Sequence, residues 1–387
     1  MNIKYYLKTY GRKFLMYFYS ITKKDKKKSA FFISFSGQQY SDSPRAISEA
    51  LHEANQNIEI IWLGNEDVKK AAPEYVKVVR AASIDALKKM AQADVWVANT
   101  SLSMGTYKNK RVFYVQTFHG DRGFKRCGYD AAATMGNQYG KSSLHFIENK
   151  ICDVYMVGSR YGRELAEKAF DYHRRITEYG IPRNDRLMNI EKYSKYADTV
   201  RQSLEISPDT KILLYAPTFR DNQRDKQDIN VDLVSALDIL SRKGDKWICL
   251  LRAHSATKEL YFASKDERIM DVSHYHDMAD LLLVSDILIT DYSSSAPEFV
   301  LTNKPVILAQ YDLEDYIKHS RTLAFDPEQS GFLIAKNTNE LNELLSNIYD
   351  YDHRAIRELV DDFYGTTESG EATKRICKEI CEWLDKK

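Results

Sequence analysis

Short apolar runs alternate with amphipathic segments along the first half of the chain. The apolar runs predict strands at 30–37, 58–64, 94–100, 111–120 and 154–159. Apolar residues at helical spacing predict helices at 44–54, at 84–93 and from Tyr161 onward. Strands that alternate with helices in this way indicate a mostly parallel sheet that is covered by helices.

The same alternation restarts in the second half, after a polar break at 190–210. Strands are expected at 211–219, 246–254, 286–294 and 304–312, and helices at 231–242 and 372–384. Two such units in succession predict an α/β protein with two Rossmann-like, doubly wound domains that face a central cleft. We place the N-terminal domain at 29–195 and the C-terminal domain at 196–387.

Residues 1–28 form an arm with a different pattern. They hold nine Lys or Arg residues, one acidic residue and seven aromatic residues. Apolar and aromatic residues recur at helical spacing from Ile3 to Ile21, and basic residues fall on another face. A basic amphipathic helix suits the surface of an anionic membrane, and the alternative is a helix that packs on its own protein. No apolar run reaches the ~18 residues expected of a membrane-spanning helix, and the start is unlike a cleavable signal peptide.

The composition narrows the class of protein. The 387 residues suffice for two domains, and the 43% of hydrophobic residues suffice for their cores. A net charge of +1 argues against nucleic acid as a partner. The five Cys residues include no CxxC pair, which disfavours a disulfide framework or a structural zinc site and favours reduced thiols.

One candidate for chemistry follows a strand of the first half. Ligands of open parallel sheets bind outside the carboxyl ends of the strands, so polar residues directly after strands are the strongest candidates. Thr117, His119 and Gly120 lie at such a place. Because neutral imidazole is a natural base near pH 7, His119 is the candidate catalytic base. The alternative is a structural, hydrogen-bonded histidine.

Two further candidate groups follow strands of the second half. Thr218 and Arg220 come after the first of these strands, and Arg220 could clamp phosphate oxygens with two N–H groups. Arg252 and His254 come after the next strand, where His254 would be a second base or a phosphate donor. The alternatives are an arginine paired with an acid and another structural histidine.

The last group interrupts a strand and precedes a helix that is expected near Pro297. The segment begins at Asp291. Ser293 and Ser294 supply hydroxyl groups, and the segment supplies backbone N–H groups, that can hold an anion, although Asp291 and the serines can also be plain helix caps. Neither GxGxxG nor GxxxxGK[ST] is present, so dinucleotide and P-loop sites lack support. We predict no metal site in the protein, because His274 and His276 have no evident third ligand.

In their order along the chain, these segments resemble the CDP-glycerol glycerophosphotransferase family of teichoic acid primases and polymerases. The family's QTWHGTPLKKLGYD box resembles QTFHGDRGFKRCGYD at 116–130. Its GYPRND and YAPTFRDN boxes resemble 180–185 and 215–222, and its LLLVSDVLITDYSS segment with NKPII downstream resembles 281–307. Several boxes in one order are far more specific than any one of them. We interpret Arg183 and Asp185, in the second box, as structural.

The resemblance implies a GT-B-type fold attached peripherally to the cytoplasmic face of the cell membrane. It implies transfer of glycerol phosphate from CDP-glycerol to a hydroxyl of a lipid-linked cell-wall or capsular glycan, with release of CMP. It also implies that His119 is the base, that His254 is the second catalytic histidine, and that Arg220, Ser293 and Ser294 bind phosphate. No cofactor is expected to be tightly bound, although the donor diphosphate can bring Mg²⁺ with it.

The sequence departs from the family pattern beside both histidines. HGTP is replaced by HGDR at 119–122, and HP by His254-Ser255. The added carboxylate of Asp121 would raise the pKa of His119 or repel a phosphate. These changes put the identity of the acceptor or of the donor in question more than the type of reaction.

Three alternatives remain open at this level. The donor could be CDP-ribitol, which the motifs do not separate from CDP-glycerol. A sugar-nucleotide glycosyltransferase of the same build is disfavoured, because Glu298 is followed eight residues later by Val306 and not by a second Glu. A non-catalytic membrane-bound scaffold is disfavoured because both His119 and His254 are present. The motifs also leave open whether the chain primes, extends once or polymerises.

Overall fold

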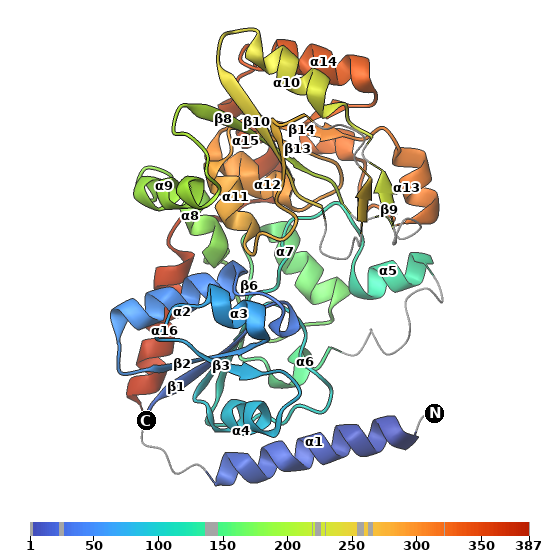
Figure 1. Cartoon of the computed structure of the whole chain (residues 1–387). Coiled ribbons are helices and arrows are strands. Elements are labelled where there is room, and N and C mark those ends of the chain that lie inside the picture. The colour runs from blue at the N-terminus through green and yellow to red at the C-terminus, as the bar shows by residue number, and fades with distance from the viewer. Residues whose placement is uncertain are drawn as a thin grey trace. The chain divides into compact units, whose positions relative to one another are not determined.

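The fold is described from a computed structural model. The structure describes residues 3–22, 27–135, 146–218, 220, 226–228, 230–253, 259–261, 266–320 and 322–386. The chain divides into two compact units, whose course Figure 1 shows. Unit 1 consists of residues 1–121, 139–185 and 367–387, and unit 2 of residues 122–138 and 186–366.

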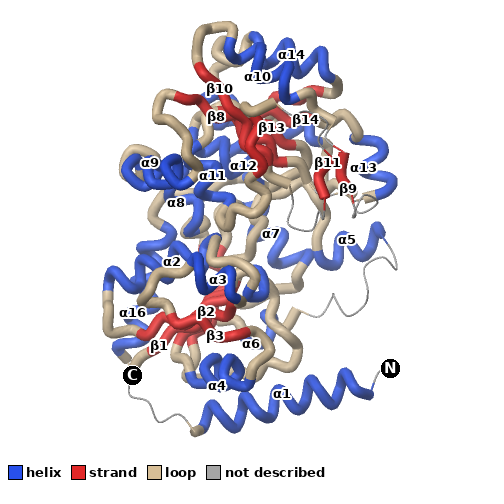
Figure 2. Tube along the Cα trace, in the orientation of Figure 1, coloured by secondary structure: helices blue, strands red, loops and turns tan. Residues whose placement is uncertain are grey.

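Unit 1 is built on a parallel sheet, which in the described residues has the strand order β3-β2-β1-β4-β5-β6-β7. The strands are β1 (Ser29–Ile33), β2 (Glu59–Gly64), β3 (Lys77–Arg80), β4 (Val95–Ala98), β5 (Phe113–Gln116), β6 (Val154–Met156) and β7 (Ile176–Thr177). The helices are α1 (Ile3–Ile21), α2 (Asp42–Ala54), α3 (Glu66–Ala71), α4 (Ile84–Gln92), α6 (Glu148–Ile151), α7 (Arg160–Glu164) and α16 (Ala372–Asp385), as Figure 2 shows. The strand order reverses between β1 and β4, which is the switch point where such sheets bind ligands.

Unit 2 repeats this plan. Its described parallel sheet has the order β12-β10-β8-β13-β14-β15, so its switch point lies between β8 and β13. The strands are β8 (Thr210–Ala216), β10 (Lys246–Leu251), β12 (Ile269–Asp271), β13 (Ile287–Thr290), β14 (Val306–Ala309) and β15 (Leu333–Ala335), with β9 (Lys226–Asp228) and β11 (Glu259–Tyr261) pairing separately. The helices are α5 (Gly128–Met135), α9 (Ser194–Ser203), α10 (Leu233–Ser241), α11 (Met278–Val284), α12 (Ser295–Phe299), α13 (Leu313–His319), α14 (Thr338–Ser346) and α15 (His353–Tyr364), and α8 (Asp185–Met188) spans the unit boundary. The prediction of two Rossmann-like domains is therefore confirmed.

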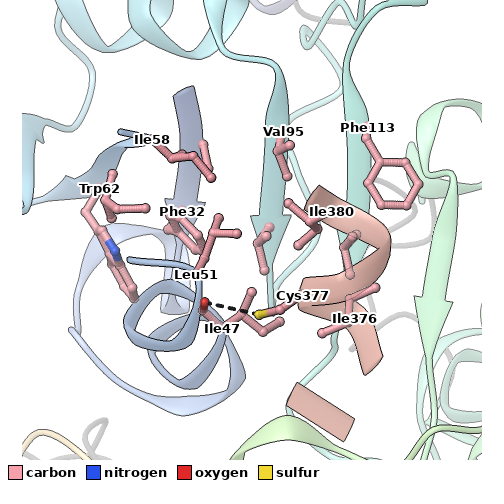
Figure 3. Packing of buried hydrophobic residues seen from close by; sticks show 14 of the residues in the cluster. Phe32, Ile47, Leu51, Ile58, Trp62, Val95, Phe113, Ile376, Cys377 and Ile380 are labelled. Carbon is pink, nitrogen blue, oxygen red and sulfur yellow. Dashed lines mark hydrogen bonds between the residues drawn. The ribbon is translucent and has the colours of Figure 1, made fainter. Parts of the chain in front are cut away.

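The domain boundaries differ from those expected from sequence. The C-terminal helix α16 was assigned to the second domain, but it belongs to unit 1. Its apolar stripe, which includes Ile376, Cys377 and Ile380, packs with α2 against the buried faces of β1 and β4, as Figure 3 shows. Burial of each such side chain stabilises the fold by about 1.5–3 kcal/mol. The apolar stripe of a helix does not show which of two sheets the helix packs against, so the sequence could not assign α16 to unit 1.

The boundary between the units also lies ten residues earlier than the polar break suggested. Unit 2 resumes at Arg186 instead of at residue 196, so α9 belongs to it. Arg186 donates a hydrogen bond to Asp280 Oδ1 at 2.6 Å, and the Tyr196 hydroxyl donates to Asp280 Oδ2 at 2.8 Å. These buried bonds tie the segment to α11, so the polar composition of 190–210 marks a surface helix and not a linker.

Helix α1 is docked on unit 1 by one of its faces. Met16 is fully buried, the Ser20 carbonyl accepts a hydrogen bond from Arg111 at 2.8 Å, and the Tyr17 ring meets Tyr107 edge-on. In the part of the chain that the structure describes, no helix is long and apolar enough to cross a membrane. Apolar side chains at helical spacing nevertheless remain half or more exposed on α1: Leu7 (69%), Tyr10 (65%), Phe14 (66%), Phe18 (50%) and Ile21 (56%).

Strands β1 and β5 end earlier than their apolar runs. β1 ends at Ile33 and β5 at Gln116, whereas the runs continue to residues 37 and 120. The backbone leaves the extended conformation because Phe35 and Phe118 have φ values of +43° and +49°. The predicted strands were therefore too long, because aromatic residues in the following loops extend the apolar runs.

Candidate functional site

Loops at the carboxyl ends of β1, β4 and β5 meet at the switch point of unit 1. The Phe35 N–H donates to Asn99 Oδ1 at 2.8 Å, and the Ser36 N–H donates to Thr100 Oγ1 at 3.2 Å. Phe35, Ser36 and Phe118 have φ values of +43°, +59° and +49°. Non-glycine residues adopt this left-handed region at a cost, and such strain concentrates at functional sites. The backbone geometry therefore marks these loops as a candidate site.

His119 is exposed and directly follows one of these left-handed residues. Its Nδ1 lies 2.8 Å from the carbonyl oxygen of Asn99. Because a carbonyl oxygen only accepts, Nδ1 carries the proton, and in the neutral ring Nε2 carries the lone pair. The ring contacts those of Phe35 and Phe118, with centroid distances of 5.4 and 4.6 Å. The imidazole is thus held in the tautomer that a general base requires.

Asp121, which lies two residues after His119 in the sequence, is buried. Its Oδ2 accepts a hydrogen bond from the Ser159 hydroxyl at 2.8 Å. A Cβ atom added at Gly162 would lie 1.8 Å from Asp121 Oδ1, so only glycine permits this approach. The carboxylate therefore joins the His119 loop to the first turn of α7, a role that the sequence did not indicate.

In unit 2, Arg220 lies buried at the carboxyl ends of β8, β13 and β14. Its Nε donates to Asp312 Oδ2 at 2.7 Å, and one amino group donates to the carbonyl and hydroxyl oxygens of Thr218 at 2.7 and 2.8 Å. The other amino group donates to Asp291 Oδ2 at 2.8 Å and to Asp312 Oδ1 at 3.1 Å. These bonds occupy all five N–H groups of the guanidinium. A phosphate clamped by Arg220 would have to displace one of them, so the geometry favours a positioning role for Arg220.

The Arg220 partners form one charged network. The Asp291 carboxylate also accepts from the Thr218 N–H at 2.9 and 3.1 Å, and the Tyr292 hydroxyl donates to Asp312 at 3.2 Å. Burial lowers the pKa of the Arg220 guanidinium, but the charges of Asp291 and Asp312 outweigh burial and raise this pKa above its ordinary value. The network fixes the loops after three neighbouring strands. The same bonds hold Asp291 and Thr218 in place.

Ser293 and Ser294 lead into α12 and are partly exposed. Ser293 Oγ accepts from the Ser295 N–H at 3.2 Å and from the Ser295 hydroxyl at 2.9 Å, whereas Ser294 makes no capping bond. Helix α12 has only five residues, so its dipole adds little. The hydroxyl groups are therefore the donors that this loop offers. Gly123, four residues after His119 in the sequence, lies beside Ser294, because an added Cβ would be 4.0 Å from that of Ser294.

Arg252 differs from Arg220 in its partners. One amino group of Arg252 donates to the Tyr275 carbonyl at 2.5 Å, and no carboxylate of the described residues forms an ion pair with it. Burial lowers the pKa of the Arg252 guanidinium. Arg252 is half-buried, and the charges of Asp277 and Asp280 act on it although neither forms a described ion pair with it. A cation in such a place is a candidate for binding an anion. The neighbouring candidate His254 lies outside the described residues.

The structural interpretation of the 180–185 segment is confirmed. The Asp185 carboxylate accepts from the N–H groups of Ala372 and Thr373 at 3.0 and 2.7 Å, which caps α16. Arg183 pairs with the buried Asp42 at 3.1 Å. Both side chains therefore serve the fold of unit 1.

Two residues of these sites were not among the sequence candidates. Asn99 supplies the carbonyl that orients His119, and Asp312 holds Arg220. Asn99 lies near the end of the predicted strand 94–100, and Asp312 is the last residue of the predicted strand 304–312, so a wider search of strand ends could have found them. Among the described side chains, no three His, Cys, Asp or Glu residues gather in a metal-binding arrangement.

Residues 15–382 match the sequence profile of the family described as CDP-Glycerol:Poly(glycerophosphate) glycerophosphotransferase. The chain is 31% identical to the teichoic acid poly(glycerol phosphate) polymerase of Bacillus subtilis (strain 168), over 98% of this chain and 52% of that protein. It is 29% identical to the teichoic acid glycerol-phosphate transferase of Staphylococcus aureus (strain NCTC 8325 / PS 47), over 93% of this chain and 94% of that protein. The chain thus spans about half the length of the first relative and nearly all of the second.

A solved structure of the wall teichoic acid polymerase TagF, soaked with CDPG, is similar over 97% of this chain and 94% of that one. The TM-score is 0.83 and the sequence identity is 29%. A relative named for ribitol phosphate, the teichoic acid poly(ribitol-phosphate) polymerase of Bacillus spizizenii (strain ATCC 23059 / NRRL B-14472 / W23), is 27% identical over 70% of this chain and 43% of that protein. The glycerol-phosphate relatives therefore match more of the chain, at higher identity.

Proposed function

The chain belongs to the CDP-glycerol:poly(glycerophosphate) glycerophosphotransferase family, and on this premise we propose that it transfers glycerol phosphate from CDP-glycerol to a hydroxyl of a lipid-linked, teichoic-acid-type glycan. CMP is the second product. One observation carries the chemistry: Nδ1 of His119 bonds the Asn99 carbonyl at 2.8 Å, which makes Nε2 the basic nitrogen.

In the proposed reaction, the acceptor hydroxyl gives its proton to Nε2 of His119 while its oxygen attacks the phosphorus that carries glycerol. A new P–O bond forms, and the bond to the bridging oxygen of the diphosphate breaks. CMP leaves with that oxygen and the electron pair, and His119 passes the proton to solvent. A general base typically raises the reaction rate by ~10²–10⁴-fold. The rest of the rate enhancement of phosphoryl transfer comes from positioning and charge stabilisation.

We assign the donor diphosphate to unit 2. Ser293 and Ser294 supply hydroxyl donors, Arg252 supplies a guanidinium, and His254 supplies a second imidazole in this assignment. Thr218, Arg220 and Asp291 act by holding the loops that present these groups. The protein itself provides no metal ligands in this proposal, and any Mg²⁺ enters with the diphosphate.

Donor choice tests the proposed function directly. The purified chain is incubated with a lipid-linked disaccharide analogue and with CDP-glycerol, CDP-ribitol or a UDP-sugar in turn. We expect nucleotide release as CMP from CDP-glycerol, and products whose mass grows by glycerol-phosphate units. Turnover with CDP-ribitol alone would indicate a ribitolphosphotransferase, and turnover with the UDP-sugar alone would indicate a glycosyltransferase. No turnover with any donor would support a non-catalytic scaffold protein.

Arg252 provides the sharpest test of the donor side. Arg252→Gln should weaken CDP-glycerol binding by about 10- to 100-fold, the effect of losing a charge-assisted hydrogen bond worth ~1.5–3 kcal/mol. Calorimetric titration measures this change. The matched control is Arg268→Gln, because Arg268 is paired with Asp266 at 2.7 Å. Equal affinities in the two variants would remove Arg252 from the donor site.

We also propose that α1 attaches the protein to an anionic membrane. Its exposed face carries Phe14 and Phe18, and Lys8 and Lys13 are exposed on the same helix. Aromatic side chains and lysines together suit the interface of a bilayer with anionic lipids. Docking of the opposite face on unit 1 leaves this apolar face outward.

The double variant Phe14→Glu, Phe18→Glu should lose binding to vesicles that contain phosphatidylglycerol. Burial of each phenylalanine is worth about 1.5–3 kcal/mol, so the two changes should lower the partition constant by ~10²-fold or more. Vesicle sedimentation measures the partition constant. Leu359→Glu is the matched control, since Leu359 is 60% exposed on α15. Undiminished sedimentation of the double variant would contradict membrane attachment by α1.

A further inference from the structure

A chain of buried hydrogen bonds lies under the His119 turn, in residues that the proposed reaction does not use. Gln116, the last residue of β5, is 2% exposed. Its Nε2 donates to the Thr100 carbonyl at 3.2 Å and to the Tyr114 hydroxyl at 3.0 Å, and its Oε1 accepts from the Phe118 N–H at 3.0 Å. The amide oxygen and both amide protons of Gln116 are therefore engaged.

The direction of each bond follows from groups that have only one role. The Phe118 N–H only donates and the Thr100 carbonyl only accepts, which fixes the orientation of the Gln116 amide. The Tyr114 hydroxyl accepts from Gln116, so its own proton points to Glu148 Oε1, 3.1 Å away. The chain from Glu148 to Phe118 thus has a single arrangement of donors and acceptors.

Glu148, the first residue of α6, anchors this relay. The same Oε1 accepts from the Leu102 N–H at 2.8 Å, and Glu148 is 3% exposed. Burial raises the pKa of the Glu148 carboxyl group and of the Tyr114 phenol. Burial of a carboxyl group destabilises the fold unless hydrogen bonds compensate. The hydrogen bonds that Glu148 accepts therefore have to offset this free-energy cost.

The relay ends on the backbone that orients the base. Phe118 has a φ of +49°, and non-glycine residues keep such a conformation only where their surroundings impose it. The Gln116 oxygen holds the Phe118 N–H, and the Phe118 ring packs edge-on against Phe170 at 4.9 Å. His119 is the next residue, and its Nδ1 reaches the Asn99 carbonyl from this turn. Without the Gln116 bond, the Phe118 backbone could leave its left-handed conformation. The imidazole of His119 would then turn away from the Asn99 carbonyl.

We propose that the relay of Glu148, Tyr114 and Gln116 positions the imidazole of His119, with Gln116 as the residue that holds the left-handed turn. The inference rests on the proposed role of His119 as the base. Gln116 is a positioning residue, since it touches neither substrate nor the transferred proton. The effect of losing it should appear in the turnover number and not in donor binding.

The test combines Gln116→Met with a second variant in the same relay. Gln116→Met should lower kcat by ~10²-fold, the effect of a misplacement of about 1 Å in a catalytic group, and should leave the KM for CDP-glycerol unchanged. Tyr114→Phe removes the hydroxyl that joins Gln116 to Glu148 but leaves the Gln116 bond to the Phe118 N–H, so it should lower kcat by less. If Gln116→Met does not fold, Tyr114→Phe decides the question in the same way. Trp96→Phe is the matched control. Trp96 lies in the neighbouring strand β4, and the change removes its buried 2.7 Å hydrogen bond to the Met90 carbonyl of α4, so kcat should stay at the wild-type value.

A double-mutant cycle separates positioning from general stability. If the relay acts through His119, then Gln116→Met costs nothing further in a His119→Ala background. An equal further loss in that background, or the same loss of kcat in Trp96→Phe, would overturn the inference and leave the proposed function intact. Wild-type turnover by His119→Ala alone would instead reject the base assignment, and the inference with it.

Discussion

Replacement of His119 by alanine should lower CMP release from CDP-glycerol by at least ~10²–10⁴-fold, the range that a general base typically supplies. The protein should stay folded, because His119 is exposed and its truncation leaves no cavity in a hydrophobic core. Turnover is measured at saturating donor, so that a change in donor affinity does not contribute. Circular dichroism on the same sample reports the fold.

His173→Ala is the matched control for this loss. His173 is an exposed histidine of the same unit, and its Nε2 lies 2.9 Å from the Asp171 carboxylate. Its replacement should leave turnover unchanged. Wild-type-like CMP release by a folded His119→Ala protein would reject the base assignment.

Replacement of Arg220 by methionine should destabilise unit 2 by about 3–5 kcal/mol, the cost of leaving a buried charge without its partner. The change leaves Asp291 and Asp312 facing each other without the cation that joins them. The substitution also removes the hydrogen bonds that link the loops after β8, β13 and β14. Denaturant unfolding measures the loss as a lower midpoint.

The same variant separates the two roles that Arg220 could have. Arg354→Met serves as the control, because its pair with Glu358 is solvent-exposed and such pairs contribute little. If Arg220 were a phosphate clamp instead of a positioning residue, Arg220→Met would weaken donor binding and leave the unfolding midpoint in place. That outcome would contradict the geometry in which five protein bonds occupy the guanidinium.

The sheet interiors could be predicted from sequence, and the sheet edges could not. Central strands such as β4 and β13 are buried on both faces, so they appear as continuous apolar runs. β3 and β15 were missed, because they lie at the edges of their sheets. In β3, both Lys77 and Arg80 are exposed, and the run carries no buried-strand pattern.

The candidate residues could be located from sequence, but their roles could not be assigned from it. The position of Arg220 after a strand was visible, yet its partners Asp291 and Asp312 lie 71 and 92 residues further along the chain. Pairing at that separation decides whether a guanidinium is available to a ligand, and only the fold brings the groups together. His119 is the opposite case, because its placement after a strand was enough to select it. The Asn99 carbonyl that fixes its tautomer lies 20 residues earlier.

The account depends on a division of labour, in which unit 2 binds the donor and His119 acts in the chemical step. The most direct measurement is the calorimetric dissociation constant of CDP-glycerol for the His119→Ala protein. We expect the wild-type value in a protein that no longer releases CMP. Loss of donor binding by this variant would contradict the account, because His119 would then belong to the donor site.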